Sequence, residues 1–156
     1  MNDLAPIKGF DLINEANHTL YALQEFYQGF NNRDYSLIEN NWSRHEQASL
    51  ANPLGGLRRG WSDISRFYQT LFSSRASVFV EYHDYHIENF GQIFIAVGRE
   101  RGYFSLDGIT VNLAIRTSRC YRLEAGCWKQ FHHHGSIEDP QLLLDYQTTV
   151  AKIRGE

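Results

Sequence analysis

The spacing of apolar residues changes once along this chain, near Ser73 and Ser74, and this change constrains the fold more than any other feature. Before it, apolar residues recur every three or four positions, which is typical of amphipathic helices. After it, apolar and polar residues alternate, which is typical of strands with two different faces. Helices followed by a run of long antiparallel strands predict an α+β fold.

The helical half predicts three helices. The first covers about residues 12–31, a short one follows Asp34 as its N-cap, and the third follows Ser62. The alternating half predicts four strands, at about residues 77–88, 92–104, 109–123 and 127–136.

Two sequence signals mark the ends of predicted elements. Asp107-Gly108 predicts the hairpin turn between the second and third strands. Asp139-Pro140 predicts the cap and first residue of a C-terminal helix. No linker, internal repeat or low-complexity segment interrupts residues 1–156, so we expect a single domain.

Composition excludes several classes of partner. The net charge of −3 and the lack of a basic cluster argue against nucleic acid, which needs a basic face. No apolar run reaches membrane-spanning length. With no apolar signal segment at the N-terminus and only two cysteines, Cys120 and Cys127, we expect a reducing cytoplasmic setting. Nothing in the sequence predicts a cofactor.

The last predicted strand carries the densest set of polar and aromatic residues. Alternation places these residues on one face: Trp128, Gln130, His132 and His134. Since helices can cover only one side of the sheet, we expect this group to form a homodimer interface. Only two of the three consecutive histidines share a face, and a metal site needs at least three ligands, so no metal is predicted.

The blocks Asn52-Pro53-Leu54-Gly55, Gly60-Trp61 and Gly126-Cys127-Trp128, with a last strand ending His132-His133-His134-Gly135-Ser136, carry a family resemblance. Over nearly the whole chain the sequence resembles the SnoaL-like branch of the nuclear transport factor 2-like superfamily. The resemblance implies a curved antiparallel sheet wrapped against helices around a cone-shaped cavity.

Comparison with ketosteroid isomerases, which share this fold, argues against steroid isomerisation. Their catalytic Asp precedes a Pro-x-Gly motif, and Asn52 stands at that position here. An amide cannot take up a proton at neutral pH, so the general base is missing.

The association domain of calcium/calmodulin-dependent protein kinase II is also similar, and two of its cavity arginines match Arg99 and Arg119. Alternation places each arginine at the end of an apolar stripe. We therefore expect both in the cavity, where they could hold one anionic group. An internal salt bridge with an acid such as Glu100 is an equally good explanation.

The predicted function is binding of a small organic molecule, anionic or polar, in the cavity. The remaining candidate ligand contacts are Tyr27, Trp42, Asn52, Trp61, Tyr68, Tyr103 and His133. Tryptophan side chains such as those of Trp42 and Trp61 more often pack in a protein core than contact a ligand. Two alternatives stay open: an isomerase, dehydratase or cyclase type of enzyme, and an assembly module similar to the kinase association domain.

Overall fold

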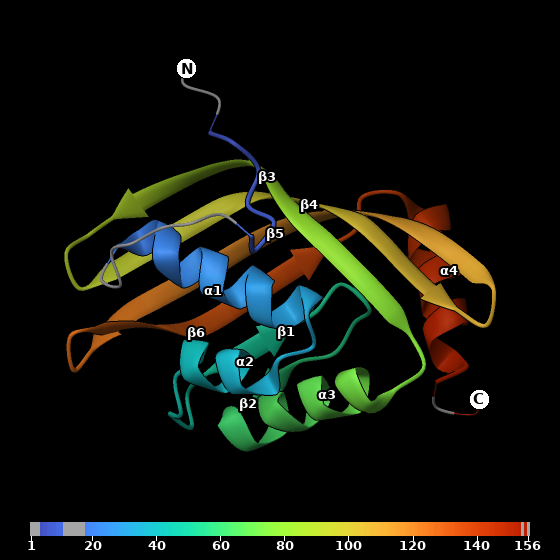
Figure 1. The fold of residues 1–156 in the computed structure, drawn as a ribbon, viewed down its shortest axis with the longest axis horizontal. Coiled ribbons are helices and arrows are strands. Elements are labelled where there is room, and N and C mark those ends of the chain that lie inside the picture. The colour runs from blue at the N-terminus through green and yellow to red at the C-terminus, as the bar shows by residue number, and fades with distance from the viewer. Residues whose placement is uncertain (1–3, 11–17, 154, 156) are drawn as a thin grey trace.

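The structure, a computed structural model, describes residues 4–10, 18–153 and 155. Its elements follow in the order α1 (Thr19–Asn31), α2 (Tyr35–Asn41), β1 (Ser49–Ala51), β2 (Arg58–Arg59), α3 (Trp61–Ser73), β3 (Ser77–Asn89), β4 (Ile93–Leu106), β5 (Ile109–Glu124), β6 (Cys127–Ser136) and α4 (Pro140–Ala151). Figure 1 shows the strands forming one sheet with the helices packed against it, which confirms the α+β prediction.

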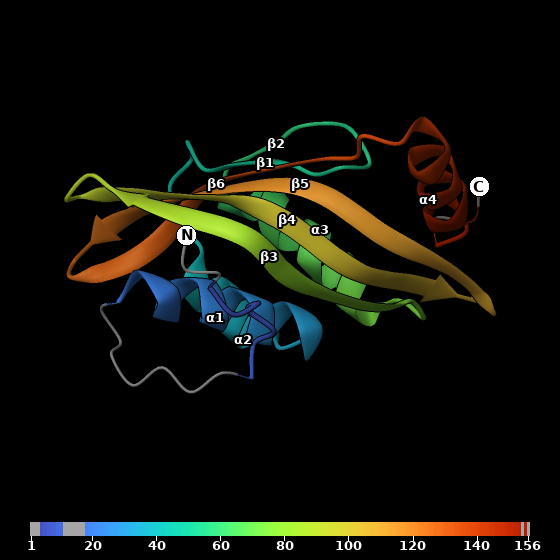
Figure 2. The same ribbon diagram turned by 90° about the horizontal axis from the view of Figure 1, so that it is seen from above.

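The strands form one curved, open sheet in the order β2-β1-β6-β5-β4-β3. The four long strands pair antiparallel with their neighbours in the chain, and β1 adds to β6 in parallel. Figure 2 shows α1 and α2 on one side of this sheet, and α4 at the end where β4 and β5 meet in their hairpin. We call the face that packs against α1–α3 the inner face.

Two of the three predicted helix caps are confirmed. The carboxylate of Asp34 accepts a hydrogen bond from the Leu37 amide at 3.2 Å, so α2 starts as predicted. The carboxylate of Asp139 caps α4 in the same way. The predicted cap Ser62 is wrong: Gly60, at φ +76, precedes the first residue of α3 and makes no side-chain cap. Residues 12–17 of the first predicted helix lie outside the described residues.

The four long strands lie within one or two residues of their predicted positions, and the turn at Asp107-Gly108 is confirmed. The two short strands β1 and β2 were missed, because two or three residues are too few to show alternation. Within the described residues, none of the helices has the length and apolar content needed to cross a membrane.

Alternation identifies the inner face of β5 correctly and that of β4 wrongly. Buried residues of β5 include Leu113, Ile115 and Arg119, as expected. In β4 the inner residues are those with even numbers, including Glu100, and Arg99 is exposed on the outer face. The start of β4 is apolar on both faces, so its pattern did not distinguish them.

A β-bulge in β6 reverses the predicted faces of its second half. Gln130 pairs with Tyr121 and His132 pairs with Cys120, so one extra residue, Phe131, lies between them. Before the bulge Gln130 faces inward; after it His133 faces inward instead.

The bulge also corrects the predicted interface group. Trp128 and Gln130 are buried inside the fold, with 9% and 0% of their surface exposed, so neither is available to a second subunit. His132 and His134 lie on the outer face.

Candidate functional site

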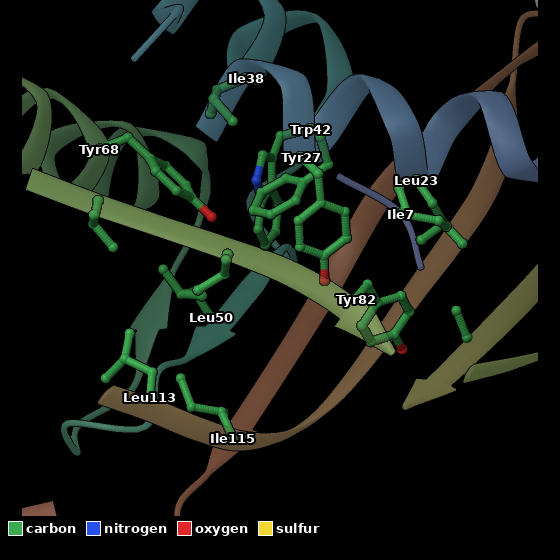
Figure 3. Close-up of a cluster of buried hydrophobic side chains, with 14 of the residues drawn as sticks. Ile7, Leu23, Tyr27, Ile38, Trp42, Leu50, Tyr68, Tyr82, Leu113 and Ile115 are labelled. Carbon is green, nitrogen blue, oxygen red and sulfur yellow. The ribbon is translucent and has the colours of Figure 1, made fainter. Parts of the chain in front are cut away.

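A cavity of about 200 Å³ opens between the inner face of the sheet and helices α1, α3 and α4. Its walls are mostly apolar and include Phe26, Phe30, Tyr68, Leu113, Ile115 and Tyr146. Figure 3 shows Tyr68 of α3 opposite Leu113 and Ile115 of β5, with Leu50 of β1 between them. Such a concave, mainly apolar space with few polar groups is typical of a small-molecule site.

Three polar residues of the cavity, Arg58, His133 and Arg119, lie in one row across the sheet. Arg58 of β2 pairs with Leu50 of β1, Leu50 pairs with His133 of β6, and His133 pairs with Arg119 of β5. Directly paired residues present their side chains to the same face. Neighbouring strands lie about 4.8 Å apart, so the backbones of Arg58 and Arg119 are about 14 Å apart.

Arg119 closes the inner end of this row, and its charge is neutralised inside the protein. It donates a hydrogen bond of 2.7 Å from a terminal guanidinium nitrogen to Oε1 of Glu100, and only 1% of its side chain is exposed. Tyr27 donates to the same oxygen at 2.7 Å and accepts from Arg119 Nε at 3.1 Å. Gln130 Oε1 accepts from the other terminal nitrogen at 2.8 Å. The partner of Arg119 is therefore the internal acid Glu100 rather than an anionic ligand.

The electrostatics of this cluster agree with its geometry. Burial alone would lower the pKa of Arg119, but the Tyr27 oxygen and the Glu100 carboxylate outweigh burial and raise that pKa, so the guanidinium stays charged. Burial raises the pKa of Tyr27, which keeps its hydroxyl as a hydrogen-bond donor. The guanidinium carbon also lies 3.6 Å from the centroid of the Phe26 ring, a cation–π contact.

Glu100 itself lines the cavity. Both of its hydrogen bonds go to Oε1, and among the described residues no side chain or amide donates to Oε2. The second oxygen is therefore available as an acceptor for a molecule in the cavity.

His133 also presents polar atoms to the cavity without a hydrogen-bond partner among the described residues. Only 7% of the residue is exposed, and neither ring nitrogen has a hydrogen-bond partner among the described residues. Burial, and then the charge of Arg119, lower the pKa of His133 well below its ordinary value, so the imidazole is neutral at pH 7. A neutral imidazole offers one donor and one acceptor.

Two further predicted site residues line the cavity. Tyr68 is buried in the wall from α3, and burial raises the pKa of its hydroxyl. Asn52 also lines it, but its side-chain oxygen accepts a hydrogen bond from the Leu54 amide at 3.0 Å and so shapes the turn. Tyr27 lies behind the wall, as a partner of Glu100.

The structure does not bring the other predicted residues to the cavity. Trp42 is buried in the core, and Trp61 packs against Tyr35 with ring centroids 6.4 Å apart. The prediction that Arg99 lines the cavity beside Arg119 is wrong, because Arg99 lies in a separate hollow on the outer face. Tyr103 is 39% exposed on that face as well.

The described residues contain no cluster of three or more side chains suited to hold a metal ion. His132 and His134 lie on the outer face and His133 on the inner one, so the alternation of side chains along β6 keeps the three rings from converging.

Sequence reasoning missed two features of the site. Arg58 lies in a two-residue strand with no readable pattern. Tyr146 belongs to α4, and its contribution to the wall depends on how that helix folds back, with its ring centroid 5.3 Å from that of Phe104. Glu100 was foreseen only as an acid that could pair internally.

The lowered pKa of His133 predicts a pH dependence of stability. Between pH 7.5 and 5.5 the unfolded chain takes up a proton at this imidazole, near its ordinary pKa of 6.5, and the folded protein does not. Stability should therefore fall as the pH falls. Between pH 7.5 and 5.5 the free energy of unfolding should fall in both proteins. The fall should be about 1.4 kcal/mol smaller in His133→Gln than in the wild type.

Urea unfolding at the two pH values measures this difference. His134→Gln is the matched control, since this neighbouring ring is exposed on the outer face, and it should keep the wild-type pH dependence. An equal pH dependence in His133→Gln and wild type would contradict the burial of a neutral imidazole.

Solved structures of low sequence identity share this fold. A protein from Thiobacillus denitrificans, provisionally described as a calcium/calmodulin-dependent protein kinase type II association domain, superposes with a TM-score of 0.67 and 20% identity, over 78% of this chain and 95% of that chain. A nuclear transport factor 2-like superfamily protein from Salmonella enterica gives a TM-score of 0.60 and 21% identity, over 74% and 84%.

A third structure, an NTF2-like protein of unknown function in nutrient uptake from Rhodospirillum rubrum, gives a TM-score of 0.64 and 14% identity, over 77% of this chain and 98% of that chain. No curated protein matches the sequence. The model of the SnoaL-like domain family matches residues 20–140. The chain therefore belongs to the SnoaL-like domain family, as its sequence motifs indicated, and its fold is shared with NTF2-like proteins.

Proposed function

We propose that the protein binds a small, mainly apolar organic molecule in the cavity, with a polar group of that molecule at the inner end. The observation that carries this proposal is the buried imidazole of His133, which has no partner among the described residues and lines an apolar cavity. A buried polar group without a hydrogen bond costs about 1–3 kcal/mol. A ligand hydroxyl or carbonyl group at His133 would recover this energy.

The residues at the inner end of the cavity determine which polar group of a ligand can bind there. The positive charge of Arg119 is already neutralised by Glu100. The neighbouring Oε2 of Glu100 can only accept hydrogen bonds, so it has no donor to offer an anion. An uncharged donor such as a hydroxyl group therefore suits the inner end better than an anion does.

The activities named for related structures are not carried over. A protein from Shewanella frigidimarina with 13% identity is provisionally named a ketosteroid isomerase. Here the amide Asn52 stands where such enzymes carry their base, and its oxygen is used in the turn to Leu54. We therefore favour ligand binding over steroid isomerisation.

A neutral probe tests the proposal. We expect 2-naphthylacetamide to bind with one molecule per chain, as measured by isothermal titration calorimetry. Leu113→Phe fills the cavity and should weaken this binding at least about tenfold, or about 1.4 kcal/mol. Val80→Phe fills the same space from β3 and serves as a second variant if the first lowers stability.

Asn112→Phe is the matched control, since Asn112 precedes Leu113 and is exposed on the opposite face. It should leave the affinity unchanged. Failure of the probe to bind, or equal binding to all four proteins, would overturn the proposal that this cavity is a ligand site.

We also propose a homodimer that buries the outer sheet face. Ile93, Val97 and Tyr103 support it, because each is at least about a third exposed on that face. Sedimentation velocity at micromolar concentration should give twice the mass of one chain. Val97→Glu should give the monomer, whereas Gln69→Glu on exposed α3 should not. A monomeric wild type would contradict the dimer.

We further propose that residues 1–156 form one domain that acts in the cytoplasm. The single continuous sheet, to which α4 packs, supports one domain. Cys120 and Cys127 are free thiols that pair in the sheet with His132 and Glu124 rather than with each other, which suits a reducing compartment.

A further inference from the structure

We infer that the ligand is an amphipathic carboxylic acid whose carboxylate binds Arg58 at the mouth of the cavity, while its apolar body extends inward to His133. This inference rests on the proposed function and adds the chemical class and the orientation of the ligand. It differs from the expectation that Arg99 and Arg119 together hold an anion.

Arg58 faces the cavity at the edge of the polar row. It pairs with Leu50, which is buried in the cavity wall, so both side chains share the inner face. The next residue, Arg59, faces the other way and is exposed. The Arg58 guanidinium carbon lies 5.2 Å from the centroid of the Phe67 ring, which holds the cation over another wall residue.

The cavity opens to solvent where Arg58 lies. Arg66 and Thr70 of α3 line the same space and are exposed, and 70% of the Arg66 side chain is exposed. The deeper wall residues, such as Leu113, are buried. The mouth is therefore bordered by β2 and α3.

Arg58 is the one arginine lining the cavity, within the described part of the chain, that has no carboxylate partner. Arg119 pairs with Glu100, and Arg66 pairs with Asp63 one helical turn earlier, at 3.2 Å. No described residue accepts a hydrogen bond from the Arg58 side chain, whose guanidinium packs over the Phe67 ring. A half-buried guanidinium beside an apolar wall is suited to a carboxylate, which it can bind through two parallel hydrogen bonds.

The charges of the two ends orient the ligand. The inner end offers no net positive charge, because Glu100 neutralises Arg119, whereas Arg58 at the mouth attracts an anion. Arg58 and His133 are two strand spacings apart, about 10 Å between their backbones. A molecule with a carboxylate at one end, an aromatic or aliphatic body, and a hydrogen-bonding group at the other end satisfies both ends together.

A matched pair of probes tests this inference. 2-Naphthylacetic acid and 2-naphthylacetamide have nearly the same size and differ in charge. At low ionic strength the wild-type protein should bind the acid about tenfold more tightly than the amide. Arg58→Gln should remove this preference by weakening the acid about tenfold and leaving the amide unchanged. Raising the salt to about 0.3 M should weaken only the acid, because the mouth is open to solvent.

Arg59→Gln is the control, since it removes the same charge from the adjacent residue on the other face, and it should retain the preference for the acid. Equal affinities for acid and amide in the wild type, or a preference that survives Arg58→Gln, would overturn the inference and leave the proposed function intact. If neither probe binds, the proposed function fails, and the inference fails with it.

Discussion

The buried ion pair between Arg119 and Glu100 is the interaction on which the rest of this structure depends. An arginine that is 1% exposed cannot be left without an anionic partner, because an unpaired buried charge costs several kcal/mol. Glu100 comes from β4, and Tyr27 of α1 and Gln130 of β6 complete the hydrogen bonds. One cluster therefore ties three strands to the first helix and fixes which face of β4 points inward.

The same cluster around Arg119 and Glu100 also determines which kind of molecule can bind in the cavity. Because Arg119 is neutralised within the protein, the inner end offers hydrogen bonds from His133 and to Glu100 rather than a free positive charge. The walls between are apolar, and the unpaired cation, Arg58, lies at the mouth. This polarity, with hydrogen bonding inside and positive charge outside, is the physical basis for an amphipathic ligand.

The sequence predicted most of the fold, because long elements carry strong periodicity. β6 begins and ends where alternation placed it, and Asp34 and Asp139 cap their helices as expected. The site was predicted less well. A single bulge at Phe131 reverses the faces of the residues that follow it, and alternation cannot reveal a bulge. β4 is apolar on both faces at its start, so Arg99 was assigned to the wrong side. Arg58 depends on a two-residue strand that no pattern marks.

A double-mutant cycle of Glu100→Gln and Arg119→Met, measured by urea unfolding of protein freed of bound molecules, tests the central claim most directly. If the pair neutralises itself, each single variant should lose about 3–5 kcal/mol of unfolding free energy, because it leaves a buried group without its partner. The double variant should lose clearly less than the sum, by about 1–3 kcal/mol or more. Additive losses, or a Glu100→Gln variant as stable as the wild type, would contradict the claim that Glu100 is the partner of Arg119.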